Sequence, residues 1–227
     1  MGDEARPEMH RWLDLALTIV MALAAVGTAW AGFQSAKWSG LQAIAFAEAG
    51  AARTESAKAA TDAGQDRLGD VVSFTAWLGA LQEDIASGAV PRPAGGYAPD
   101  PAEVSGFLYE RFRPEFRVAV DAWVDTHPPI DPAAPATPFV MPEYTLASEQ
   151  AEAELVAEAE AATQRAHEDN QRSDNYVFMA VILALALFFA GVAGRSRTVR
   201  SQWLLSVASF ATFLGAALVL VLLPKTF

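Results

Sequence analysis

The sequence of 227 residues contains no cysteine, and this absence removes several classes of protein at once. A chain without thiols cannot form a disulfide framework, a cysteine-ligated zinc site or a cysteine nucleophile. Basic residues are also scarce, since 16 lysines and arginines stand against 27 acidic residues. Because a nucleic-acid-binding protein needs a basic face, we expect no nucleic acid among its partners.

The sequence also lacks the short motifs of common enzymes. It contains no dinucleotide-binding G-x-G-x-x-G, phosphate-binding P-loop, H-E-x-x-H zinc motif or G-x-S-x-G nucleophile elbow. Its three histidines are far apart, and none follows a glutamate at the E-x-x-H spacing of di-iron bundles. We therefore expect no catalytic residues, no cofactor and no metal ligands, and we predict that the protein is not an enzyme.

Apolar residues are plentiful instead, at 52% of the chain, although the net charge is −11. They gather in three long runs, at 13–33, 176–194 and 203–223. About 20 apolar residues in a helix cross a hydrocarbon core of about 30 Å, and a helix satisfies its own backbone groups there. The runs predict three transmembrane helices in an all-α membrane protein.

The first run has a second interpretation as a cleaved signal peptide. Arg6 and Arg11 precede it, and the sequence Ala29-Trp30-Ala31 is similar to a signal-peptidase site. The run is longer than a usual signal core, however, and it contains Asp14. We therefore predict that it is retained as the first span, and cleavage stays open.

Arginines in the short loops predict the orientation of the spans. Arg195, Arg197 and Arg200 lie in the loop 195–202, which has no acidic residue. Cytoplasmic loops carry an excess of Lys and Arg, so this loop and the N-terminal tail 1–12 are predicted to be cytoplasmic. Residues 34–175 and the tail 224–227 then lie outside the cytoplasm.

The acidic charge belongs to the predicted extracytoplasmic domain. Residues 34–175 contain 23 acidic and 10 basic residues, a net −13, whereas the rest of the chain carries +2. Alanine-rich stretches at 34–68 and 147–175 favour helix, and each continues directly from a span. They predict an antiparallel helical stalk, since small side chains let two helices approach closely.

A small helical cap is predicted between the two stalk helices. An apolar stripe at helical spacing runs from Val71 to Ile85. Asp100 predicts a helix N-cap, with Pro101 at the first helical position, and Pro114 predicts the end of that helix or a kink in it. Residues 128–142 contain six prolines, which predict an extended strap without helix.

Four local strings resemble a family of uncharacterised bacterial multi-pass membrane proteins. They are WAGFQSAKW at 30–38, RFRPEF at 111–116, TPFVMPEY at 137–144 and NQRSDNY at 170–176. They occur in the same order over nearly the whole chain. No activity is established for that family, so the resemblance implies only a bacterial cytoplasmic (inner) membrane and a topology.

Small residues recur at every fourth position in each span. Such stripes permit close helix contact, so we predict packing between spans, or between protomers of a homo-oligomer. The stripes consist of Ala24, Thr28 and Gly32, then Ala186, Ala190 and Gly194, then Ala208, Thr212 and Ala216.

Two charged clusters are candidate binding sites outside the membrane. Arg111, Arg113 and Arg117 could contact an anionic ligand, a lipid head group or a partner, or could form salt bridges within the acidic domain. Asp62, Asp66 and Asp70 fall on one helical face and could attract a cation. The interpretation that we favour is a solvated face, or pairing with Arg67, Arg165 or Arg172.

These patterns favour a non-enzymatic, membrane-anchored interaction or scaffold module that contacts the lipid bilayer and an unknown envelope protein. The first alternative is a homo-oligomeric channel or pore, lined by hydroxyls of the spans such as those of Thr18, Ser206, Ser209 and Thr212. The second is an envelope ligand sensor that binds at Arg111 and Arg113.

Overall fold

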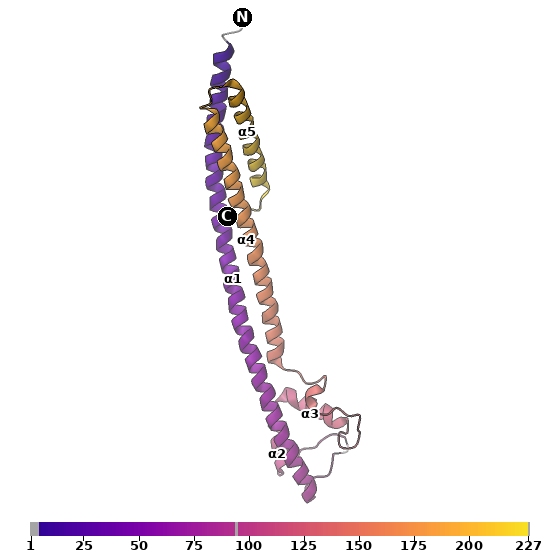
Figure 1. The fold of residues 1–227 in the computed structure, drawn as a ribbon. Coiled ribbons are helices and arrows are strands. Elements are labelled where there is room, and N and C mark those ends of the chain that lie inside the picture. The colour runs from indigo at the N-terminus through magenta and orange to yellow at the C-terminus, as the bar shows by residue number, and fades with distance from the viewer. Residues whose placement is uncertain (1–4, 94, 227) are drawn as a thin grey trace. The chain divides into compact units, whose positions relative to one another are not determined.

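The computed structural model describes residues 5–93 and 95–226. It is 79% helix, and the described residues contain no strand. The elements are α1 (Ala5–Ser87), α2 (Val104–Tyr109), α3 (Pro114–Asp125), the 3-10 helix η1 (Pro138–Val140), α4 (Ala147–Ala193) and α5 (Val199–Leu222) (Figure 1). They form two compact units: unit 1 comprises residues 1–49 and 160–227, and unit 2 comprises residues 50–159.

Three helices, α1, α4 and α5, are long and apolar enough to cross a membrane. This confirms the prediction of an all-helical chain with three apolar helices. The first two extend far beyond their apolar runs, as the alanine-rich flanks predict, because no proline occurs in these extensions, 34–87 of α1 and 147–175 of α4. Residues 1–4 of the predicted tail 1–12, and residue 227 of the predicted tail 224–227, lie outside the described residues.

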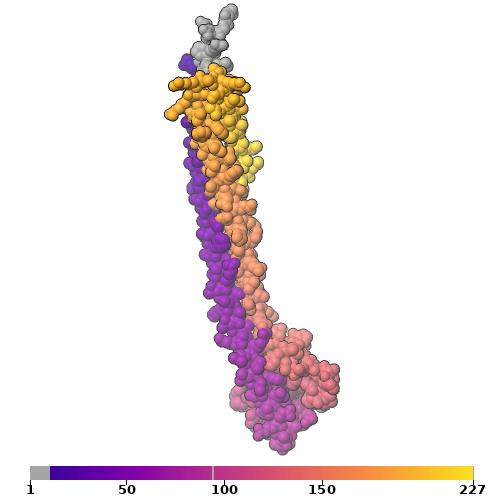
Figure 2. Space-filling model, in the orientation of Figure 1, coloured from indigo at the N-terminus to yellow at the C-terminus, as the bar shows by residue number. Residues whose placement is uncertain are grey.

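In unit 1, α1 and α4 pack against each other in opposite directions. Ser35 and Ser39 each lie 2.9 Å, oxygen to oxygen, from Ser173. Further along α1, Glu48 forms an ion pair of 3.0 Å with the earlier α4 residue Arg165. Figure 2 shows the surface of α1 beside that of α4 here. The two helices are therefore antiparallel in unit 1.

The buried face of α1 in unit 1 repeats every seven residues. It carries Leu17, Ala24, Ala31, Trp38 and Ala45, all of which are buried. A seven-residue repeat is the pattern of a left-handed coiled coil, and alanine at most of these positions leaves little side-chain volume between the helices. We call this row of residues the alanine seam.

The seam explains where the predicted four-residue stripes lie. Ala24, Ala186, Ala190 and Ala216 are buried, whereas Gly32 and Gly194 are exposed, and the remaining three residues are intermediate. Two side chains eight residues apart on a helix point in directions that differ by about 80° around the helix axis, whereas two that are seven residues apart differ by only about 20°. Gly32 therefore points away from the seam that Ala24 and Ala31 share, and a role for Gly32 and Gly194 between protomers stays a prediction.

The end of α5 is fixed to both neighbouring helices. The buried side chain of Gln34 donates to the carbonyl oxygen of Thr226 and accepts its backbone N–H, both at 3.0 Å. The Tyr176 hydroxyl donates to the carbonyl oxygen of Pro224 at 2.9 Å. Backbone groups that follow α5 are thus satisfied by side chains of α1 and α4.

Unit 2 builds its core around the last part of α1. Phe74, Trp77 and Leu81 of α1 pack against the aromatic residues of α2, α3 and the strap, and Figure 2 shows these segments gathered around α1 within the unit. The predicted stripe includes Phe74 and Leu81 but not Trp77, which is fully buried.

Three local predictions in unit 2 are wrong. Glu103, not Asp100, is the N-cap of α2, because the Asp100 carboxylate accepts the N–H of Ala102 and closes a turn before the helix. Pro114 begins α3 instead of ending α2, in the first helical turn, where its missing N–H costs nothing. The strap 128–142 contains the 3-10 helix η1, whose fixed proline φ suits a tight turn.

Candidate functional site

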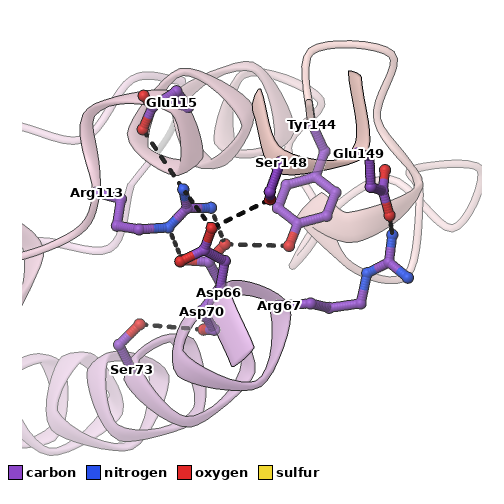
Figure 3. A network of polar contacts seen from close by, with 9 residues as sticks. All are labelled: Asp66, Arg67, Asp70, Ser73, Arg113, Glu115, Tyr144, Ser148 and Glu149. Atoms are coloured by element: carbon purple, nitrogen blue, oxygen red, sulfur yellow. Dashed lines mark hydrogen bonds and ion pairs between the residues drawn. The ribbon is translucent and has the colours of Figure 1, made fainter. Parts of the chain in front are cut away.

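A buried ion pair in unit 2 joins segments that are far apart in sequence. Asp70 of α1 is 2% exposed. The guanidinium of Arg113, the residue before α3, donates to both carboxylate oxygens of Asp70, at 3.1 and 2.6 Å (Figure 3). The hydroxyl of Tyr144, which precedes α4, donates to the same carboxylate at 3.0 Å. Three segments therefore converge on one buried charge.

This geometry shifts the pKa of both donors upward. The hydrogen bond to Asp70, followed by the charge of that carboxylate, outweighs burial and raises the pKa of Arg113. Burial, followed by the charge of Asp70, raises the pKa of Tyr144 to about 12. Both groups thus keep their protons at physiological pH, as bidentate and charge-assisted bonds to a carboxylate require.

Looser contacts surround the pair. Ser148 donates to Asp66 at 3.3 Å, and the Arg113 guanidinium lies 3.9 Å from Asp66 and 3.6 Å from Glu115 (Figure 3). The sequence favours either a solvated face or an arginine partner for the aspartates, and the structure pairs Asp66 and Asp70 with Arg113 rather than with Arg67, Arg165 or Arg172. Among the described residues, no group of three or more acidic or histidine side chains is placed to hold a metal ion.

The arginine cluster 111–117 separates into three different environments. Arg111 lies over the ring of Phe107, at 3.3 Å from its centroid, and donates to its carbonyl oxygen. Arg117 donates to the carbonyl oxygen of Glu110 at 2.9 Å, while Arg113 binds Asp70. Anion or partner contact at Arg111, Arg113 and Arg117 stays a prediction, but the three do not form one site.

Unit 2 also holds buried polar groups that the sequence analysis missed. The Asp84 carboxylate is buried and accepts the backbone N–H of Ser105 at 2.9 Å. The backbone carbonyl oxygen of Asp84 accepts the N–H groups of Ala89 and Val90. One residue of α1 therefore holds both α2 and the loop that follows α1. The signal available in the sequence is the seven-residue spacing of Asp70, Trp77 and Asp84.

A partly open cavity of about 220 Å³ lies beside the core of unit 2. Two tryptophans, Trp77 and Trp123, contribute to its wall, and Arg92 is its one charged lining residue. Unit 1 has a larger and more open groove of about 620 Å³ between α1 and α4. Asp14 and Arg195 line that groove at one end.

The remaining predicted residues lie in unit 1. Arg195, Arg197 and Arg200 are exposed, around the turn that joins α4 to α5. The hydroxyls proposed to line a pore donate instead to backbone carbonyls: Thr18 to Asp14, Ser206 to Gln202, Ser209 to Ala186 and Thr212 to Ala208.

Comparisons of the chain with protein-family models, with curated proteins and with solved structures found no match in any of the three, so the family resemblance of the local strings stays a prediction.

Proposed function

We propose that this protein is a non-enzymatic, membrane-anchored interaction module whose unit 2 binds a partner outside the cytoplasm. The observation that carries the proposal is that unit 2 has its own aromatic core and acidic composition, whereas unit 1 contains the apolar helices. Unit 2 contains 18 acidic and 7 basic residues, a net −11. Such a charge favours solubility in water.

The proposal includes a stalk made of α1 and α4. Both helices run from one unit into the other without a break. In unit 2 the start of α4 lies beside α1, where Ser148 contacts Asp66 and Glu149 contacts Arg67. We propose the α1–α4 pair as the stalk of this module.

Exposed apolar side chains on unit 2 support a protein partner. Val104, Phe107, Val118, Ile130 and Val140 are all exposed on this water-facing unit. Exposed apolar groups are inexpensive to desolvate, and together with aromatic anchors they supply the apolar contact of protein interfaces.

The orientation can be tested by single-cysteine labelling, because the chain has no cysteine of its own. We would introduce Ala133→Cys in unit 2 and Val199→Cys at the start of α5, both at exposed positions. A membrane-impermeant maleimide should label the first variant in intact cells and the second only after lysis. The reverse pattern would overturn the proposed topology.

The interaction itself can be tested with photo-cross-linking residues at Val118 and Val140. The matched control is Leu204, an equally exposed residue of α5 in unit 1. The proposal expects a discrete cross-link to another protein from the unit 2 positions and not from Leu204. Cross-links only between copies of this chain, with conductance in planar bilayers, would favour the pore instead.

A further inference from the structure

The cavity of about 220 Å³ in unit 2 has mainly apolar walls. Trp77, Leu81 and Ile85 of α1 form one side, and Trp123 and Val124 of α3 form another. Typical pockets for drug-sized ligands measure about 300–1,000 Å³. This cavity is smaller, so it suits one ring or one branched side chain.

The third side of the cavity is held in place by backbone geometry. Pro93, Pro128 and Pro129 line it, and proline has a fixed φ. His127, at φ 59°, adopts the left-handed conformation that often follows a helix end, and so turns the chain from α3 into the two prolines. A preformed cavity loses little conformational entropy when it is filled.

One cation lines the apolar cavity. The exposed Arg92 guanidinium has no hydrogen bond or ion pair within the described part of the chain. In contrast, Arg111 and Arg117 contact rings and carbonyls, and Arg113 binds Asp70. An unpaired arginine is unusual in a unit of net charge −11, and its planar fork matches a carboxylate.

A second polar group in the cavity wall also has no partner. Trp77 is fully buried, and its indole N–H meets no acceptor among the described residues. Buried indole N–H groups usually find an acceptor, and an unsatisfied buried donor calls for an explanation. The Trp77 N–H is closed off from solvent, so Arg92 is the charged group of the cavity wall that a ligand can reach.

We propose that this cavity binds a compact apolar side chain or ring that carries a free carboxylate. The apolar group would fill the space between Trp77 and Trp123, and the carboxylate would pair with Arg92. The inference rests on the proposed function, because it names the chemistry by which unit 2 would recognise its partner. That chemistry is supplied by the C-terminal residue of a partner protein or by a small free acid.

The test uses the full chain in lipid nanodiscs, titrated with 3-phenylpropanoate and followed by tryptophan fluorescence and calorimetry. A ligand of this size is expected to bind with a Kd of about 1 mM. The uncharged 3-phenylpropanamide should bind about tenfold more weakly, because it loses a charge-assisted hydrogen bond. The peptide acetyl-Gly-Gly-Phe, with a free or an amidated C-terminus, distinguishes a protein terminus from a small acid.

Arg92→Gln should remove the preference for the acid over the amide, whereas the matched control Arg111→Gln should keep it. Ile85→Phe, at a half-buried position in the cavity wall, should abolish binding of every probe without removing Arg92. Equal binding of acid and amide, unchanged binding in Arg92→Gln, or no binding of any probe at 20-fold its expected Kd would overturn the inference. If the cavity fails these tests but Val118 or Val140 still cross-links to another protein, the inference about the cavity is wrong and the proposed interaction module is not. The failure of one proposal can therefore be distinguished from the failure of the other.

Discussion

The buried pair of Asp70 and Arg113 gives the sharpest prediction about stability. Replacing Arg113 with methionine keeps the apolar stem but leaves the carboxylate of Asp70, which is 3% exposed at its side chain, with Tyr144 as its remaining donor. Removing one partner of a buried pair costs about 3–5 kcal/mol. Because the side chain of Arg113 is itself 30% exposed, we expect the lower end, about 3 kcal/mol.

The control and the assay follow from the same geometry. Arg67 pairs with Glu149 nearby, but both side chains are about half exposed, so Arg67→Met should cost at most about 1 kcal/mol. The free energy of unfolding of unit 2 is measured on the full chain in nanodiscs by hydrogen exchange of the amides of Trp77 and Trp123.

The double variant Asp70→Leu/Arg113→Met decides whether the buried charge causes the loss. Replacing a whole buried ion pair with apolar residues is often neutral, so the double variant should recover most of the stability lost in Arg113→Met. If the double variant loses as much stability as Asp70→Leu and Arg113→Met lose in sum, the reasoning from an uncompensated buried charge is refuted.

Three further predictions concern other contacts. Raising the pH from 10 to 12 should destabilise unit 2, because the Tyr144 pKa of about 12 in the folded chain exceeds its unfolded value of 10.0. The stability that Tyr144 contributes is therefore complete below pH 10 and is lost as the pH rises through 12. In hydrogen exchange measured against pH, Tyr144→Phe should show a smaller loss of stability over this range. Gly106→Ala should unfold the α2 region in hydrogen exchange, because a Cβ there would lie 1.9 Å from the carbonyl oxygen of Asp100, whereas Gly79→Ala, which meets no atom, should stabilise α1 by about 0.5–1 kcal/mol. Gln34→Leu should cost about 1–3 kcal/mol and speed exchange of the Thr226 amide, since it leaves that N–H and carbonyl unpaired; unchanged exchange would show that the contact contributes nothing.

Most of what the sequence predicts correctly depends on local signals. The three apolar helices follow from runs of residues whose length alone matches a membrane, and the long continuations of α1 and α4 follow from alanine and from the absence of proline. The sequence also indicates close helix packing through small residues. A four-residue stripe drifts around the helix, while Ala24 and Ala31 keep to one face, so the structure buries some residues of the predicted stripes and leaves Gly32 and Gly194 exposed.

What the sequence does not predict depends on contacts between distant residues. Asp70 and Arg113 are 43 residues apart, and no local spacing relates them, so the sequence does not single out Arg113 as the partner ahead of Arg67, Arg165 or Arg172. Trp77 was missed for a different reason. It lies on the same face as Asp70 and Asp84, and two charged neighbours at seven-residue spacing make this face look solvated, although all three side chains are buried.

The alanine seam reverses the usual sensitivity of a protein core to mutation. In an ordinary core the damaging changes remove volume, because they leave a cavity. At Ala24, Ala31 and Ala45 there is almost no volume to remove, so glycine costs only helix propensity, about 1 kcal/mol, whereas leucine has to push two backbones apart. In a library of all single substitutions, tolerance along this face of α1 should therefore decrease with residue size rather than with polarity, and serine should be accepted where leucine is not.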